Sequence, residues 1–400
     1  MRIALIADVF PPLRSSGAVQ LRDLSHELVR QGHQLTVMIP ASDLKTPWLL
    51  EDMNGVEVLR LKAPRSRDMG YMRRTLGELL MPFLMRRNLQ KSPLAGVRWD
   101  GVVWYSPTIF LGPIVSSIKR ASDCRSYLVI RDIFPEWAVD MGLLGRGLPY
   151  RFFKAVERYQ YSVADVIGVQ TPANLPYFSK AGLQPGQQVE VLQNWLAHAS
   201  NTGCSISVTN SALAGRTIFV YAGNMGVAQG MGILIDLAER LRSRDDIGFL
   251  FVGRGSEAKI LRDEAIRRGL GNVVFYDEIA PEEIPGLYAQ CHAGIVALDP
   301  RHKTHNVPGK FLTYMQAGLP VLASINPSND LIQMIERERV GRVWTDQSVA
   351  NLEALVGRLV DEIKADTGMP VRCKALSTKL FAPEAAVKQI TSALLAKAAA

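Results

Sequence analysis

The sequence predicts an α/β protein with two doubly wound domains, each built around a parallel sheet. Short apolar runs alternate with amphipathic stretches along nearly the whole chain, as expected for strands that are buried on both faces beneath covering helices. The alternation stops once, at the small and polar residues 198–215, and then begins again. A length of 400 residues also exceeds what one ordinary domain needs.

The first domain is expected at residues 1–197. Its strands are expected in the apolar runs, and its first helix begins near Ala18. In chain order these runs are RIALIAD, QLTVMIP, VEVLRL, GVVWYSP, RSYLVIRD, ADVIGVQ and VEVLQN.

Residues 198–215 are expected to form a linker, and residues 216–382 a second domain. The apolar runs of this domain are TIFVYAG, IGFLFVG, VVFYDE, AGIVAL and PVLAS. Residues 383–398 carry apolar side chains at helical spacing, so a last helix is expected there, packed back on the first domain.

Composition restricts the compartment and the chemistry. No run of about 18 apolar residues occurs, and Asp8 interrupts the apolar start of the chain, so neither a membrane span nor a signal peptide is predicted. The cysteines lack the paired spacing of disulfide frameworks or zinc sites; they are Cys124, Cys204, Cys291 and Cys373. A cytoplasmic protein with reduced thiols is expected.

The net charge of +8 is concentrated in the first half of the chain. Residues 60–98 hold ten Lys and Arg against two acidic residues. Four of these arginines flank large apolar side chains: Arg73, Arg74, Arg86 and Arg87. The combination is typical of a helix that lies on an anionic membrane surface, and a plain surface helix is the alternative. Nucleic acid is not expected, because no recognised binding module accompanies the charge.

Glycine-containing turns follow several predicted strands, where doubly wound sheets bind their ligands. In the first domain, Gly17 would let a ligand approach the backbone and the start of the next helix. In the second domain, one turn contains Asn224 and Gly226, and another places Arg254 between two glycines as a possible anion ligand. Neither of the first two turns has the Gly-x-Gly-x-x-Gly spacing of a dinucleotide site.

The stretch HNVPGKFLTYMQAGLPVLAS predicts a helix over residues 308–317 that Gly318 terminates. Lys310 lies in its first turn, where the helix dipole disfavours a cation unless an anion is bound. A diphosphate would satisfy both the backbone amides and the ammonium, whereas a solvated surface lysine is the alternative. Thr313 and Tyr314 are expected to project from the same face near the start of the helix.

Two carboxylates follow the run RSYLVIRD, namely Asp132 and Glu136. A carboxylate at the carboxyl end of a strand can act as a general base, and a turn or helix cap is the commoner alternative. No Asp-x-Asp pair is available to hold a nucleotide diphosphate through a metal, and His302 and His305 have no obvious companion ligands. No metal or other cofactor is therefore expected.

The segments FPP with Gly17, DIFPEW, QNW, YAGNMGVAQG and VPGKFLTYMQAGLP occur in one order along the chain. Together they resemble the retaining nucleotide-sugar glycosyltransferases of family 4, which have the GT-B fold. More narrowly, they are similar to the bacterial fucosaminyltransferase-like group of O-antigen and capsule assembly. The resemblance implies two facing Rossmann-like domains with a cleft between them, the donor bound mainly on the second domain and the acceptor on the first.

The resemblance also implies roles for the matching donor-side positions. Gly17 would bring backbone to the donor diphosphate from the first domain, and Arg254 would assist from the second. Ile279 would border the nucleobase. The main diphosphate ligands would be Asn224, Gly226 and Lys310.

Two further implications concern the acceptor and the departures from the family pattern. Asp132, or Glu136 as second choice, would orient or deprotonate the acceptor hydroxyl. The wider family has an arginine and a lysine where this chain has Asn224 and Gln229, so Lys310 must contribute more. It also has two glutamates at the positions aligned with His305 and Thr313, and the second normally binds the ribose.

The expected function is the retaining transfer of an N-acetylated amino sugar, such as N-acetylfucosamine, from a UDP-sugar to a saccharide carried on a lipid (polyprenyl) diphosphate. The reaction would take place at the inner face of the cytoplasmic membrane, on a peripherally bound enzyme. A UDP-sugar 2-epimerase of the same architecture and a non-catalytic protein that binds sugar nucleotides are the alternatives.

Overall fold

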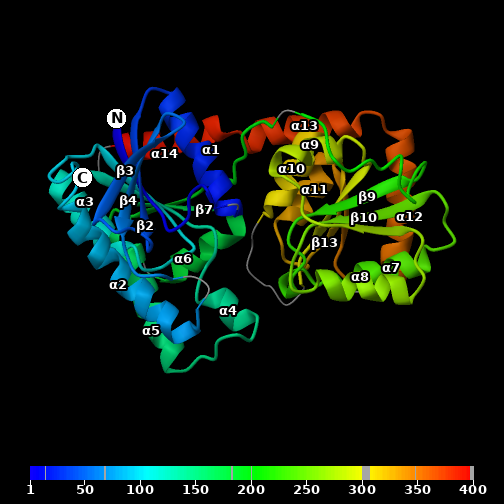
Figure 1. Ribbon diagram of the computed structural model, residues 1–400, viewed down its shortest axis with the longest axis horizontal. Helices are drawn as coiled ribbons and strands as arrows, with labels where there is room; N and C mark the ends of the chain where they lie inside the picture. Colours follow the sequence, from blue (N-terminus) through cyan, green and yellow to red (C-terminus); the bar gives the residue numbers. More distant parts are fainter. Residues whose placement is uncertain are drawn as a thin grey trace. The chain divides into compact units, whose positions relative to one another are not determined.

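The structure is a computed structural model that describes residues 1–13, 15–66, 69–181, 183–199, 201–299, 307–346 and 348–396. The chain forms two compact units, one of Met1–Leu196 with Ala382–Ala400 and one of Ala197–Phe381. Each unit is a sheet with helices on both faces, as Figure 1 shows.

The sheet of the first unit has the strand order β3-β4-β2-β1-β5-β6-β7-β8. Its strands are β1 (Arg2–Ile6), β2 (Gln34–Ala41), β3 (Trp48–Met53), β4 (Val56–Lys62), β5 (Gly101–Tyr105), β6 (Arg125–Val129), β7 (Val166–Val169) and β8 (Gln188–Val191). Its helices are α1 (Ser16–Arg30), α2 (Tyr71–Leu89), α3 (Gly112–Ser122), α4 (Glu136–Asp140), α5 (Leu148–Val163), α6 (Leu175–Ala181) and α14 (Pro383–Leu395), with the 3-10 turn η1 (Pro172–Asn174).

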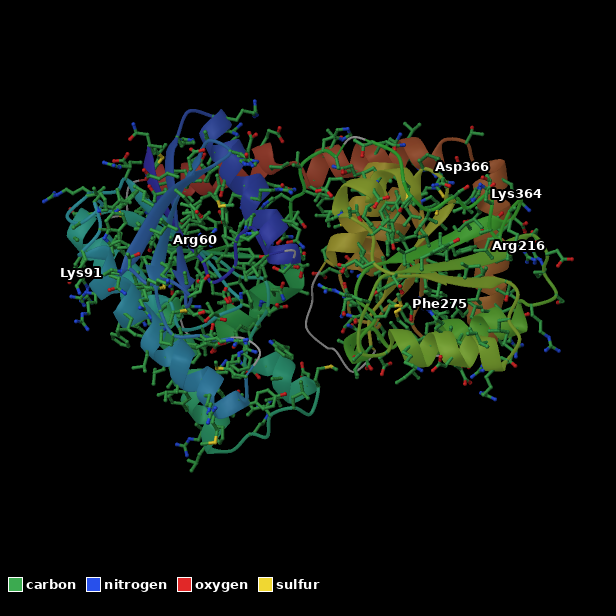
Figure 2. All side chains as sticks on the ribbon, in the orientation of Figure 1. Arg60, Lys91, Arg216, Phe275, Lys364 and Asp366 are labelled. Atoms are coloured by element: carbon green, nitrogen blue, oxygen red, sulfur yellow. The ribbon has the colours of Figure 1, made fainter. Side chains whose placement is uncertain are left out.

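The edge strand β3 was not expected, and it makes the sheet mixed instead of wholly parallel. It runs antiparallel to β4, and the two strands are joined by Asn54 and Gly55, which both have positive φ, 55° and 83°. An Asn-Gly pair with this geometry forms a tight hairpin whose twist matches that of the strands. Arg60 of β4, labelled in Figure 2, forms an ion pair with Glu51 of β3.

The two faces of the first sheet carry different helices. Side chains of α2, α3, α5 and α6 pack into one apolar cluster with alternate residues of β1, β5 and β6. Side chains of α1 and α14 pack into a second cluster with the other residues of the same strands. The last helix therefore covers the first unit, where Leu394 lies against Gly101 of β5. The expected end of this helix at residue 398 lies outside the described residues.

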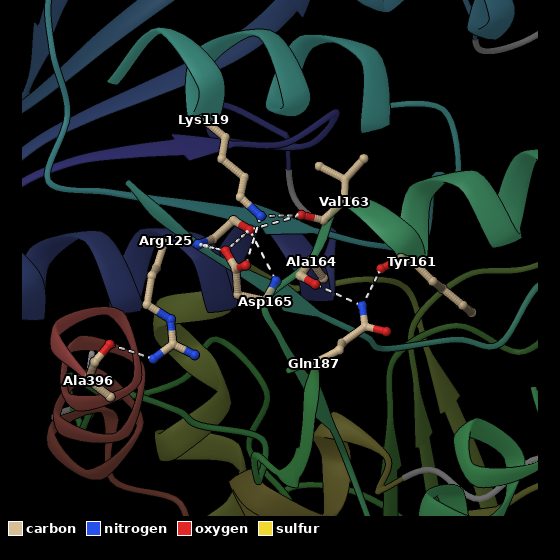
Figure 3. A network of polar contacts seen from close by, with 9 residues as sticks. Lys119, Arg125, Tyr161, Val163, Ala164, Asp165, Gln187 and Ala396 are labelled. Carbon is tan, nitrogen blue, oxygen red and sulfur yellow. Dashed lines mark hydrogen bonds and ion pairs between the residues drawn. The ribbon is translucent and has the colours of Figure 1, made fainter. Parts of the chain in front are cut away.

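A group of polar contacts lies at the edge of the first sheet where β6 and β7 begin (Figure 3). Lys119 of α3 donates to the carbonyl of Val163 at 3.0 Å and forms an ion pair of 2.8 Å with Asp165, which directly precedes β7. Further hydrogen bonds join Gln187 to the carbonyls of Tyr161 and Ala164, and Arg125 to the carbonyl of Ala396. These polar groups serve the fold at the edge opposite to the one where ligands bind in such sheets.

The second sheet has the order β11-β10-β9-β12-β13-β14, with every described pair parallel. Its strands are β9 (Thr217–Ala222), β10 (Ile247–Val252), β11 (Val273–Tyr276), β12 (Ala293–Ala297), β13 (Val321–Ser324) and β14 (Gly341–Trp344). Its helices are α7 (Gly232–Arg240), α8 (Ala258–Arg267), α9 (Ile284–Tyr288), α10 (Gly309–Ala317), α11 (Leu331–Glu338), α12 (Val349–Ala365) and α13 (Met369–Leu380), with the 3-10 turns η2 (Val227–Gln229) and η3 (Pro281–Glu283).

Helices α7, α8 and α12 cover one face of the second sheet, and α9, α10 and α13 pack together on the other (Figure 1). Phe275 of β11, labelled in Figure 2, stacks on Phe251 of β10 with 4.9 Å between the ring centres. The described residues of the segment expected to be a linker, 198–215, are grouped with this unit. Its apolar side chains Ile206, Val208 and Leu213 are buried, so the hydrophobic effect holds it against the domain.

Candidate functional site

Lys310 lies in the first turn of α10, which begins at Gly309, one residue later than expected. Its side chain is half-buried, and its Nζ lies 4.6 Å from the centre of the Tyr221 ring. Within the described part of the chain, no carboxylate forms an ion pair with this ammonium. Burial lowers the pKa of Lys310 to about 8. A cation that is partly removed from water and has no counter-charge is well suited to bind an anion.

Gly223, directly after β9, leaves the space that the end of the Lys310 side chain occupies. A Cβ on residue 223 would lie 2.9 Å from Cε and 3.0 Å from Nζ of the lysine, so any larger residue would displace the ammonium. Gly223 also has φ of 135°, which favours glycine. The turn after β9 and the first turn of α10 are therefore fitted to each other.

The glycines after β10 have a packing role that the sequence did not predict. A Cβ on Gly253 would clash with the carbonyl of Gly223, and one on Gly255 would clash with the carbonyl of Met225. The N–H of Met225 donates to the carbonyl of Arg254 at 2.7 Å. The turn after β9 and the turn after β10 are thus in direct backbone contact. This contact alone accounts for Gly253 and Gly255, without a ligand.

Asn224 and Gly226, both expected to hold the diphosphate, are bonded to Gln229. The Gly226 N–H donates to Gln229 Oε1 at 2.9 Å, and the Asn224 side-chain amide donates to the same oxygen at 3.3 Å. Gln229 therefore holds the turn together. Asn224 is exposed and can turn toward a ligand, whereas the N–H of Gly226 is already satisfied.

Arg254 contacts Glu278, the residue that precedes Ile279 in the chain. Arg254 Nε forms an ion pair of 3.1 Å with Glu278, and its side chain is 74% exposed. Ile279 is half-buried in the loop that follows β11. Because Arg254 is so exposed and already paired, it is a weaker candidate for anion binding than Lys310.

The expectations for Thr313 and Tyr314 have different outcomes. The Thr313 hydroxyl donates to the carbonyl of Lys310 at 2.9 Å, so it is engaged with its own helix. Tyr314 as a donor-binding residue is wrong. Its side chain is fully buried, its hydroxyl donates to the carbonyl of Val220 at 3.1 Å, and its ring packs on Gly294. Tyr314 lies one helical turn after Lys310 on the same face of α10. At that turn the sheet covers the face, because the Tyr314 ring packs on Gly294 of β12.

Gly17 lies inside the first turn of α1, because this helix begins at Ser16 and not near Ala18. Ser15 caps the helix by accepting a hydrogen bond from the N–H of Ala18 at 3.3 Å. A Cβ on Gly17 would lie 3.3 Å from the ring and the hydroxyl of Tyr105. The missing side chain thus permits tight packing on β5 and also leaves the helix start uncovered.

Asp132 is half-buried in the segment that follows β6. It interacts electrostatically with Arg131 and with Tyr105, at the end of β5. Its carboxylate therefore lies at the carboxyl edge of the first sheet, where a base for a bound substrate is needed.

Glu136, the second choice for the base, is engaged in a polar network. Its carboxylate accepts hydrogen bonds from Tyr150 at 2.8 Å and from Lys154 at 2.9 Å. Lys154 also contacts Glu157 and Tyr177. Burial by itself raises the pKa of Glu136, but the bonds from Lys154 and Tyr150 outweigh it and lower the pKa. The structure assigns Glu136 to anchoring α4 on α5 and α6.

The four arginines expected at a membrane surface lie on α2. All of their side chains are exposed: Arg73, Arg74, Arg86 and Arg87. Arg74 pairs with Glu78 on the same helix at 2.9 Å. Large apolar side chains of the same helix are exposed as well, namely Tyr71, Met72, Leu76, Leu79, Leu80 and Phe83. In the part of the chain that the structure describes, no helix is long and apolar enough to cross a bilayer.

The segment around α5 adds to this surface and was not singled out from the sequence. Its exposed large apolar side chains are Leu143, Leu148, Phe152 and Tyr159. Helix α3 packs against both α2 and α5, so these helices share one side of the first unit (Figure 1). Arg151 and Arg158 of α5 are exposed beside the apolar residues. Only the fold brings the two segments to one side.

Metal ligands are not grouped among the described residues: no three His, Cys, Asp or Glu side chains lie together as a cation site would require. His302 and His305 lie outside the described residues.

Solved structures of low sequence identity share the fold of the whole chain. Sucrose-phosphate synthase from Thermosynechococcus elongatus superposes with a TM-score of 0.72 at 15% identity, covering 98% of each chain. HepE of Anabaena, solved in complex with UDP-glucose, superposes with a TM-score of 0.68 at 16% identity, covering 98% of this chain and 99% of HepE. The fold is GT-B, with two Rossmann-like units.

Both units also match glycosyltransferase families in sequence. Residues 17–195 match the family described as glycosyl transferase 4-like domain, and residues 216–362 match glycosyl transferases group 1. WbjE of Pseudomonas aeruginosa, named as a probable glycosyltransferase, is 22% identical over 90% of this chain and 89% of its own length. WcaI of Escherichia coli (strain K12), a glycosyl transferase assigned by name to colanic acid biosynthesis, is 26% identical over 50% of this chain and 52% of its own. The chain is a glycosyltransferase that contains both of these domains.

Proposed function

We propose that this chain transfers an N-acetylated amino sugar, such as N-acetylfucosamine, from a UDP-sugar to a saccharide on a lipid diphosphate, with retention of configuration and without a bound metal. The sequence resemblance to the fucosaminyltransferase-like group supports the sugar class and the retention. HepE, which shares the fold, was solved with UDP-glucose. WcaI is named for colanic acid biosynthesis, and this name is in line with the proposed role in bacterial surface polysaccharide assembly.

The observation that carries the donor half of the proposal is the position of Lys310. Its ammonium lies at the first turn of α10, against Tyr221 and Gly223, without a carboxylate partner in the described ranges. The diphosphate of a nucleotide sugar would bring two negative charges to this cation and to the start of the helix. Asn224 would turn from Gln229 to the same anion.

The ribose of the donor must be bound without a carboxylate at position 313. The Thr313 hydroxyl is engaged with the carbonyl of Lys310, so a threonine offers at most a shared hydrogen bond there. The proposed nucleobase contact is with the backbone around Ile279, in the loop after β11.

The acceptor half rests on Asp132 and on the surface of α2 and α5. Asp132 would orient or deprotonate the acceptor hydroxyl, because Glu136 is bonded to Lys154 and Tyr150. Exposed arginines beside exposed Leu, Phe and Tyr side chains suit the headgroup region of an anionic bilayer. We accordingly propose peripheral binding at the inner face of the cytoplasmic membrane, where a lipid-linked acceptor is presented.

The test is a binding and turnover screen of nucleotide sugars with the purified chain. UDP-N-acetylhexosamines are expected to bind more tightly than GDP- or CMP-sugars in calorimetry, and to be hydrolysed slowly when no acceptor is present. Transfer to a polyprenyl diphosphate saccharide should continue in EDTA and give a product with the anomeric configuration of the donor, read by NMR. Tight binding of another nucleotide class, or an inverted product, would contradict the proposal.

A further inference from the structure

Arg131 is a buried cation that the sequence did not single out. It directly follows Ile130 at the carboxyl edge of the first sheet, and its side chain has 7% exposure. None of its three guanidinium nitrogens has a partner that meets ordinary hydrogen-bond geometry among the described residues. Arginine keeps its proton in proteins, so a permanent positive charge lies inside the first unit. Burying such a charge without hydrogen bonds is unfavourable, and an apolar residue would avoid that cost.

Two aromatic rings lie near the charge, and the hydroxyl of one of them, Tyr105, also acts on it. The guanidinium carbon lies 4.3 Å from the ring centre of Trp195 and 5.9 Å from that of Tyr105. Both rings are held in place by α1, because Tyr105 donates to the side chain of Gln20 at 2.7 Å and Trp195 donates to its carbonyl at 2.6 Å. The faces of such rings attract a cation but do not neutralise it.

The charged and titratable groups around Arg131 come from several elements. Asp132 and Tyr105 act on it electrostatically, and Tyr127 of β6 does so while donating its own hydrogen bond to Glu190. Asp8, which follows β1, acts on Tyr105. From the segment after β7, the neutral side chain of Gln170 donates to the carbonyl of Arg131 at 3.1 Å. Asp132 is the neighbour to which the proposed function gives a chemical role.

We propose that Arg131 is a positioning residue of the transfer reaction, whose buried positive charge keeps the neighbouring carboxylate of Asp132 ionised. A carboxylate must be ionised to accept a proton or a hydrogen bond from the acceptor hydroxyl. An opposite charge nearby favours that form, and the effect is large where water is excluded. This inference rests on the proposed function, in which Asp132 acts on the acceptor.

The experiment compares the pH dependence of kcat in three variants of the full chain. In Arg131→Met, loss of the cation should move the acid limb of the profile to higher pH by about one unit. In Arg131→Lys, which retains the charge, the limb should stay near that of the wild type. Arg125→Met serves as the matched control, because Arg125 lies at the other end of β6 and bonds only the carbonyl of Ala396 in the described part of the chain. An unmoved limb in folded Arg131→Met would overturn the proposal.

A second measurement does not depend on whether the methionine variant folds. In the wild-type chain labelled with ¹³C at aspartate carboxyl carbons, the Asp132 signal, assigned with Asp132→Asn, should titrate at lower pH than an aspartate in a short unstructured peptide. Titration at the same or a higher pH would also overturn the proposal. A failure of the proposed function would give a different result. In that case Asp132→Asn would transfer sugar at the wild-type rate, independent of the pH at which Asp132 titrates.

Discussion

The ammonium of Lys310 lies 4.6 Å from the centre of the Tyr221 ring and meets no carboxylate among the residues that the structure describes. The ring face attracts the cation, but it leaves the outward side of the ammonium open to a stronger partner. Gly223 keeps the space beside the ammonium clear of side-chain atoms. This pair of residues is the best-defined feature of the candidate donor site.

Replacing Lys310 should therefore weaken binding of the donor. We expect Lys310→Ala to raise the Kd for UDP, measured by calorimetry, by more than about tenfold, since it removes a charge-assisted contact to the diphosphate. Lys259→Ala is the control, because that lysine is exposed on α8 and pairs only with Asp263 in the described ranges. An unchanged Kd in a folded Lys310→Ala protein would remove the lysine from the site.

The same lysine should make donor binding depend on pH. Because burial lowers the pKa of Lys310 to about 8, UDP affinity should fall as pH rises from about 7 to 9, and Lys310→Ala should lose this slope. The sign for stability is opposite. In the unfolded chain the lysine holds its proton up to about 10.5, so its contribution to folding becomes more favourable as pH rises from about 8 to 10.5. Calorimetry across a pH series in wild type and variant measures the binding slope.

Asp132 is expected to act in transfer and not in donor binding. Asp132→Asn should keep the wild-type Kd for UDP and lower kcat by about a hundredfold or more, because an amide cannot take a proton from the acceptor. Asp140→Asn, at the end of the nearby α4, should leave kcat unchanged. The assignment fails if Asp132→Asn turns over at the wild-type rate.

Glu136 is expected to affect stability more than chemistry. Glu136→Gln breaks a charged bond to Lys154 in a half-buried network, so the free energy of unfolding should fall by about 1–3 kcal/mol in urea titrations. Because the folded chain lowers the pKa of Glu136, its stabilising contribution is present above the unfolded pKa and is lost as pH falls through the folded pKa. Complete loss of transfer with unchanged stability would show instead that Glu136 is catalytic.

The surface formed by α2 and α5 should bind anionic vesicles. Sedimentation with liposomes containing phosphatidylglycerol should recover the wild-type chain at low salt, and the double variant Arg86→Glu with Arg87→Glu should lose most of this binding. Phe83→Ser should weaken binding also at high salt, because it removes apolar contact instead of charge. Arg358→Glu on α12 of the other unit is the control. Equal sedimentation of all proteins would exclude this surface.

Much of the local structure follows from patterns along the chain. The alternation of apolar runs and amphipathic segments predicted most strands of both sheets, and the proline and glycine around residues 308–318 predicted α10 to within one residue. The Asn54-Gly55 signal was also present and would have predicted the β3–β4 hairpin. β14 was not predictable in this way, because only Trp344 of its four residues is buried and the strand carries little apolar periodicity.

By itself, the sequence determined the fold class, the extent of α10 to within one residue and the position of Lys310 in its first turn. Only the tertiary structure decided that Tyr314 lies in the core, that Gln229 already bonds the Gly226 N–H, and that Arg131 is buried between rings. The physical reason is that a local pattern sets the direction of a side chain relative to its own helix or strand. Burial, hydrogen-bond partners and electrostatic surroundings depend on segments that are distant in the chain and adjacent only after folding.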